Sequence, residues 1–87
     1  MSRLEQELGA DYQQVLLDYL GQEHVIDMGF APTWWITCDR DTNWKGKSYW
    51  VRKALNQMKK DGLVESFKSR TGSVGWCWAL AGKMREW

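Results

Sequence analysis

The fold is decided by residues 51–65, which read VRKALNQMKKDGLVE. Apolar residues in this stretch recur at the i, i+4 and i+7 spacing of one helix face: Val51, Leu55 and Met58. A helix with a single apolar stripe buries that stripe against the rest of its domain and leaves the other side to solvent. The pattern therefore predicts an amphipathic helix over residues 48–61.

Both ends of this predicted helix carry residues that are typical of helix ends. Ser48 precedes the apolar stripe, and serine is a favoured N-cap because its hydroxyl accepts a hydrogen bond from a free backbone N–H. Lys59 and Lys60 lie in the last turn, where the helix dipole favours positive charge. Gly62 follows that turn and Leu63 can fold back on it, which predicts a Schellman stop.

An earlier segment has a second apolar stripe at helical spacing, formed by Tyr12, Val15, Leu16, Tyr19 and Leu20. Asp11 stands at the N-cap position and Gly21 ends the pattern. These features predict a helix over residues 11–22.

Residues 32–38 give a more ambiguous signal. Pro32 suits the first turn of a helix, where its missing N–H is not needed, and residues 33–38 would form a short second helix. The β-branched and aromatic residues of this segment also fit a strand, so both interpretations stay open. The polar residues 39–47 are expected to form a turn.

The C-terminal part of the chain has the pattern of a β-hairpin. Residues 63–68 are strand-like, residues 68–73 are rich in turn formers, and residues 74–80 alternate, with Trp76, Trp78 and Leu80 on one face.

This order of elements, together with residues 51–65, resembles the winged helix-turn-helix superfamily of bacterial and phage regulators. Members commonly carry the pattern VRxxLxxLxxxGLV here, followed by a glycine-bearing wing and a strand similar to Trp78, Ala79 and Leu80. The resemblance covers residues 11–80. It implies an α+β fold, a winged helix-turn-helix of three helices plus a C-terminal β-hairpin wing. Residues 1–87 are expected to form a single domain, with the core over residues 11–80 and a short extension at each end.

Charge is segregated along the chain, although the formal net charge is only +1. Residues 1–44 hold eight acids and two bases, a net charge of −6. Residues 45–70 hold eight bases and two acids, a net charge of +6. A basic segment of this kind indicates a surface made for an anionic polymer, although a basic helix face can also be a simple solvated face.

Candidate DNA contacts lie on the helix predicted over residues 48–61 and at the hairpin tip. Helical residues are about 100° apart, so burial of the apolar stripe turns Tyr49, Arg52 and Asn56 outward. We expect these three to read bases, because arginine pairs with guanine and asparagine with adenine in the major groove. The candidates for contacts to the DNA backbone are Lys45, Lys47, Ser48, Lys53, Lys60, Lys68 and Arg70. The resemblance implies that the wing, residues 67–75, lies on the DNA backbone or in the minor groove.

The expected function is that of a small transcriptional regulator that binds double-stranded DNA in the cytoplasm. The chain has one histidine, His24, no Ser/His/acid set and no phosphate-binding glycine loop, so an enzyme is not expected. Cys38 and Cys77 lack the clustered spacing of zinc ligands, and neither a metal nor a cofactor is expected. No signal peptide or membrane-spanning apolar run is recognisable, and two unpaired thiols fit a reducing compartment.

Other partners stay open. A winged helix can also bind a protein, and exposed tryptophans would favour that alternative. A protein that binds RNA or a single strand would need Trp76 or Trp78 exposed for base stacking. In a small chain with seven tryptophans we expect both of these, and also Trp44 and Trp50, to be core residues. Segments considered for a homodimer contact are the two ends of the chain, with Leu4 and Leu8 or Met84 and Trp87.

Overall fold

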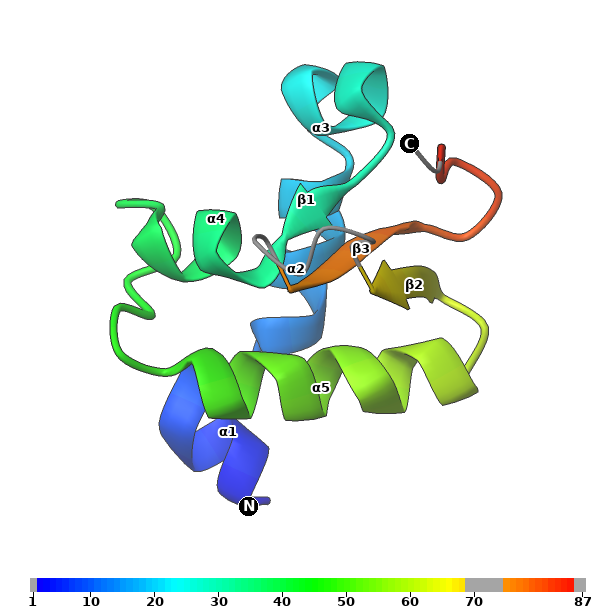
Figure 1. Cartoon of the computed structure of the whole chain (residues 1–87). Helices are drawn as coiled ribbons and strands as arrows, with labels where there is room; N and C mark the ends of the chain where they lie inside the picture. Colours follow the sequence, from blue (N-terminus) through cyan, green and yellow to red (C-terminus); the bar gives the residue numbers. More distant parts are fainter. Residues whose placement is uncertain (1, 69–74, 86–87) are drawn as a thin grey trace.

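Five helices and three strands follow one another along residues 2–68 and 75–85, the part of the chain that the computed structural model describes. In chain order they are α1 (Arg3–Leu8), α2 (Tyr12–Leu20), α3 (Glu23–Met28), β1 (Ala31–Pro32), α4 (Thr33–Cys38), α5 (Ser48–Lys60), β2 (Val64–Lys68) and β3 (Trp76–Leu80). In Figure 1, α5 runs along one side of the molecule, with α4 and the sheet above it and α1 below it. The fold is α+β, as the sequence predicts.

Helix α5 and its stop match the prediction closely. The side chains of Val51, Leu55 and Met58 are all 0% exposed, so the apolar stripe is entirely buried. The Leu63 N–H donates to the carbonyl of Met58 at 3.0 Å, and the Gly62 N–H donates to that of Lys59 at the same distance. Gly62 has a φ of +78°. Together these features form a Schellman motif.

The predicted cap at the start of α5 is wrong. Lys47 occupies the N-cap position, and its carbonyl accepts the first helical hydrogen bond from the Val51 N–H at 3.0 Å. Ser48 is therefore already inside the helix, and no side chain caps this end. The chain enters α5 through a turn in which the Lys47 N–H donates to the carbonyl of Trp44 at 2.9 Å, and this turn shifts the helix start by one residue.

The sheet has three antiparallel strands in the order β1-β3-β2, with β3 in the middle (Figure 1). Strands β2 and β3 pair along their whole length, from Val64 opposite Leu80 to Lys68 opposite Trp76, in agreement with the predicted hairpin. Strand β1 was not predicted. It has only two residues, and Pro32 cannot donate a ladder hydrogen bond. The predicted wing tip, including Arg70, lies outside the described residues.

The prediction of three helices is wrong, because the described residues contain five. Helix α1 is held by Leu4 and Leu8, both buried, and is capped by the Ser2 hydroxyl, which accepts from the Glu5 N–H at 3.2 Å. Helix α3 contributes one buried residue, Val25. Since Leu4 and Leu8 are covered within the single chain, they do not offer an exposed surface for a dimer.

The two remaining helices were expected, with small differences. Helix α2 lies within the predicted residues 11–22, but the Asp11 side chain makes no capping hydrogen bond. Residues 33–38 are helical, which decides between the two interpretations of this segment. Pro32 was expected in the first turn of α4 and instead lies in β1, with an extended backbone at φ −61° and ψ 152°.

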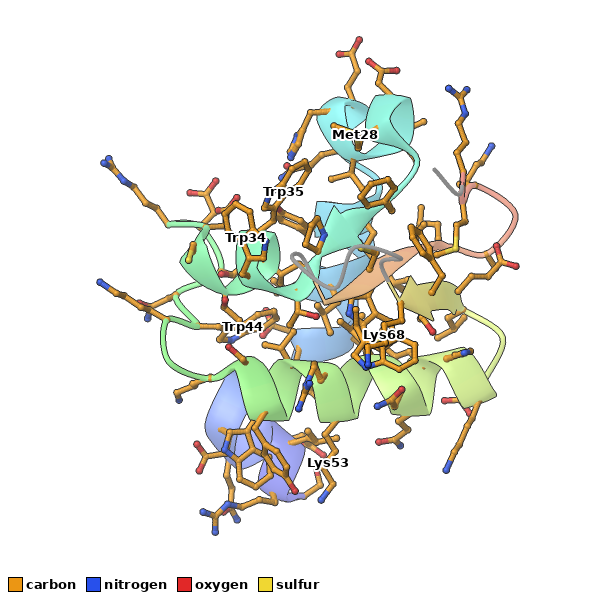
Figure 2. All side chains as sticks on the ribbon, in the orientation of Figure 1. Met28, Trp34, Trp35, Trp44, Lys53 and Lys68 are labelled. Atoms are coloured by element: carbon orange, nitrogen blue, oxygen red, sulfur yellow. The ribbon has the colours of Figure 1, made fainter. Side chains whose placement is uncertain are left out.

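Two buried tryptophans join the elements through their indole N–H groups. Trp44, which lies just above the start of α5 in Figure 2, donates to the carbonyl of Leu8 at 3.0 Å. Trp78 donates to the hydroxyl of Thr33 at 2.8 Å. A buried indole needs such a partner, because an unpaired donor in the core costs free energy. The first contact ties α1 to the loop before α5, and the second ties the sheet to α4.

Near the end of the described chain, the backbone of Arg85 lies against Gly29. The Arg85 N–H donates to the Gly29 carbonyl at 3.0 Å. Gly29 has a φ of +91°, and a Cβ at this position would overlap the side chain of Arg85. This contact fixes the segment after β3 on the end of α3.

Candidate functional site

The outward side of α5 carries the residues that the sequence predicts for contacts to DNA. Arg52, Lys53, Asn56 and Lys60 are all exposed, and Tyr49 is 59% exposed. They face solvent because the opposite side of the helix is completely buried in the core. The structure thus brings the three predicted base-reading residues onto one face.

A hollow of about 390 Å³ lies between α5 and β3. It is lined by Tyr49, Arg52, Lys53, Asn56, Trp76 and Trp78. No acidic residue is among them. The sequence does not predict this hollow, because the hollow forms only where residues of the helix and of the strand meet in space. The only sequence signal was the alternation that puts Trp76 and Trp78 on one face of a strand.

Two of the polar groups at the hollow have no partner within the described part of the chain. Neither the guanidinium of Arg52 nor the amide of Asn56 pairs with another described side chain. Both groups are therefore available to a ligand. Arginine offers up to five donors in a planar array, and asparagine offers both a donor and an acceptor.

Lys53 shares an aromatic neighbour, Trp50, with Arg3 of α1. Its ammonium is 5.9 Å from the ring centroid of Tyr49 and 5.6 Å from that of Trp50, and the guanidinium of Arg3 lies 5.2 Å from the same Trp50 ring. Figure 2 shows Lys53 on the α1 side of α5 and Lys68 on the side of the sheet. The cations thus border the outer face of α5 on both sides.

The lysines before α5 differ in their surroundings. Lys45 is exposed, whereas the ammonium of Lys47 donates to the Glu7 carbonyl at 2.6 Å and lies 3.8 Å from its carboxylate. The ammonium of Lys47 therefore helps to hold α1 against the start of α5. Ser48 is exposed at the start of the helix.

The cations at the other end of the site are free of acidic partners in the described chain. Lys60 and Lys68 are exposed and form no ion pair there. The ammonium of Lys59 donates to the hydroxyl of Ser66 at 2.9 Å. Arg70, the remaining predicted contact, lies outside the described residues.

The tryptophans divide into core and surface. Trp44 and Trp78 are buried, which confirms the prediction for these two, and Trp50 is half-buried against the core. Trp76 was expected in the core, but it is 40% exposed. Burial does not alternate along β3, because Cys77, Trp78 and Ala79 are all buried and Trp76, at the start of the strand, is exposed. Trp34, on α4, is 52% exposed.

Two ionisable side chains that do not line the hollow, Tyr19 and Cys77, have a raised pKa. Burial, with a smaller effect of the charge on Asp39, raises the pKa of Tyr19 from 10.0 to about 12. Burial also raises the pKa of the Cys77 thiol, whereas Cys38 is exposed. Across residues 2–68 and 75–85, no three His, Cys, Asp or Glu side chains gather as a metal site would require.

Comparison of the chain with protein-family models, with curated proteins and with solved structures gives no match. Within the described residues, no helix has the length and the apolar character needed to cross a membrane. The function therefore has to be inferred from the residues of the chain and their arrangement.

Proposed function

We propose that this protein is a small winged helix-turn-helix regulator that binds double-stranded DNA. Helix α5 enters the major groove, and the wing, residues 67–75, lies on the backbone or in the minor groove. The observation that carries this proposal is the outer face of α5, where Tyr49, Arg52 and Asn56 stand together among lysines. A helix fits the major groove, and such a face presents donors to base edges and cations to phosphates.

The arrangement of the elements supports the fold part of the proposal. A short helix, α4, contacts α5, as the helix pair of a helix-turn-helix would, and a hairpin of β2 and β3 follows. The hairpin packs on α5 and has β1 as its third strand. This is the order of helix, short helix, basic helix and wing that the resemblance implies. Helices α1 and α3 are additions to it.

The residues have separate roles in this proposal. Arg52 pairs with a guanine, Asn56 with an adenine, and Tyr49 contacts a base edge nearby. Contacts to the DNA backbone come from Lys45, Lys47, Ser48, Lys53, Lys60, Lys68 and Arg70. Because Lys47 already contacts Glu7, we expect it to contribute less to phosphate binding than Lys45 does.

Two substitutions on α5 test these roles. A preferred duplex is first selected from a random library, and binding of single-base variants is then measured by fluorescence anisotropy. Arg52→Ala should cost about 1–3 kcal/mol and relax the preference at one base pair, while Lys60→Ala should weaken all duplexes alike. Gln57→Ala, exposed and uncharged on the same helix, is the matched control and should bind as the wild type does.

Two results would contradict the proposal. If the wild-type protein binds no duplex from the random library at low salt, it is not a DNA-binding protein. If Arg52→Ala and Lys60→Ala weaken binding equally at every base pair, α5 does not read bases.

A specific observation favours a second candidate function, the binding of a protein partner. Trp34 exposes half of its surface on α4, and tryptophan is enriched at the energetic centres of protein interfaces. The partner in this second candidate function is a second copy of this chain, because one module of this size buries only about 600–1,000 Å² on DNA. Sedimentation of the wild type and of Trp34→Ala, with and without duplex, distinguishes a homodimer from a monomer.

A further inference from the structure

The hollow between α5 and β3 is lined by aromatic, cationic and amide groups. Its aromatic wall comes from two different elements, with Trp76 on β3 and Tyr49 on α5, both with large exposed fractions. Arg52 and Lys53 supply positive charge, and Asn56 supplies an amide. A planar, anionic ligand with hydrogen-bonding edges is the complement of such a surface.

The tryptophan side of the hollow is held in place from behind. Trp78 is 1% exposed and donates its indole N–H to Thr33, and the Thr33 hydroxyl lies 3.3 Å from the carbonyl of Trp76, to which it donates. Trp76 is also the strand partner of Lys68 in the antiparallel pairing of β2 and β3. The rings of Trp76 and Trp78 lie 6.4 Å apart, tilted by 34°. The backbone of Trp76 and the Trp78 ring beside it are therefore held in place, and a site that is already ordered loses little conformational entropy when a ligand binds.

The size of the hollow fits a ligand smaller than a helix of DNA. Sites for small ligands measure about 300–1,000 Å³, and the hollow, at about 390 Å³, is at the lower end of this range. A base that is still paired cannot present its face to Trp76, because its neighbours in the duplex cover that face. An unpaired base can, and every base has such a face for stacking on an aromatic side chain.

We propose that this hollow takes one unpaired nucleobase of the bound DNA, stacked on Trp76, with the phosphate next to it held by Lys53. The inference rests on the proposed function and extends it to distorted or partly opened duplexes. A base within a strand is favoured over a free nucleotide, because exposed cations stand on both sides of the lining residues in the chain, Lys45 before α5 and Lys60 at its end.

The test compares two DNA probes. One is a continuous duplex of about 20 base pairs, two helical turns, and the other has the same sequence with a single bulged thymidine at its centre. The wild-type protein should bind the bulged duplex about tenfold more tightly, the usual contribution of one stacked base. Trp76→Ala should bind both duplexes equally, whereas Trp76→Phe, which keeps a ring, should retain most of the preference.

Gln57→Ala is the matched control, since it changes an exposed, uncharged residue of α5 that does not line the hollow. It should keep the preference in full. The far-ultraviolet circular dichroism of each variant shows that it is folded, and Trp76→Phe carries the test if Trp76→Ala unfolds. Excess adenosine monophosphate is added as a competitor and should leave the bulged duplex bound.

The outcomes separate this inference from the proposed function. Equal binding of both duplexes by the wild type overturns the inference and leaves DNA binding intact. A preference that persists in Trp76→Ala also overturns it, and displacement by adenosine monophosphate shows that the hollow takes free nucleotides instead. Absence of binding to either duplex overturns both proposals.

Discussion

Raising the salt concentration should weaken DNA binding by an amount that can be worked out from the exposed lysines. Lys45, Lys53, Lys60 and Lys68 are exposed, and none of them forms an ion pair with a described carboxylate. Each is a candidate phosphate contact. Every contact that forms releases counterions from the DNA, so the affinity falls as the salt concentration rises.

With Arg70 as the fifth cationic contact of the proposal, the logarithmic salt slope is about −4.5, since each contact contributes about −0.9 on double-stranded DNA. Between about 50 and 200 mM salt, the affinity should therefore fall about 500-fold. Lys45→Ala should reduce the slope to about −3.6 and the fall to about 150-fold. Lys47→Ala should leave the slope nearly unchanged, because the ammonium of Lys47 is engaged by Glu7.

Fluorescence anisotropy of one labelled duplex, measured at several salt concentrations, gives the slope for the wild type and for each variant. Urea unfolding of the same proteins supplies the complementary measurement. Lys47→Ala should lower the free energy of unfolding by about 1 kcal/mol, because it removes a charged hydrogen bond that is partly exposed to solvent. Lys45→Ala, at an exposed position, should not change it measurably.

This reasoning is refuted by a wild-type slope between 0 and about −1, which would mean that the lysines do not contact phosphates. It is also refuted if Lys45→Ala and Lys47→Ala reduce the slope equally. In that case Lys47 would contact phosphate as Lys45 does, in spite of its contact with Glu7.

Three further predictions concern stability and reactivity. Trp44→Phe should lower the free energy of unfolding in urea by about 2–4 kcal/mol, because it leaves the carbonyl of Leu8 without its donor and opens a small cavity. Since the pKa of Tyr19 is about 12 when folded against 10.0, stability should fall as the pH rises through this interval, and Tyr19→Phe should remove this loss in thermal melts. Ellman's reagent should modify Cys38 quickly in the native protein and Cys77 only in urea, so native Cys38→Ser should not react.

The parts of the fold that the sequence predicts well are those with a local periodic signal. Helix α5 has four buried residues in one stripe, and its stop depends on Gly62 and Leu63, which follow its C-cap residue Asp61. Helices α1 and α3 have six residues each, with two buried residues in the first and one in the second. So few apolar positions give no recognisable period, and tertiary packing has to stabilise such short helices.

The candidate site shows the same difference between local and long-range information. The outward direction of Tyr49, Arg52 and Asn56 follows from helical geometry alone. The hollow does not, because Asn56 and Trp76 are 20 residues apart in the chain and meet only after the hairpin packs on α5. The engagement of Lys47 by Glu7 also depends on α1, a helix that sequence analysis did not predict.

The close approach of Arg85 to Gly29 determines which substitutions the chain can tolerate. Gly62 has a similar positive φ, but a Cβ there would meet no atom within 4 Å, so asparagine can replace it at modest cost. At position 29 the backbone angle and the occupied space act together, and even alanine would push Arg85 and its neighbours off α3. In saturation mutagenesis, position 29 should accept glycine alone, and compensating changes should cluster in residues 83–85.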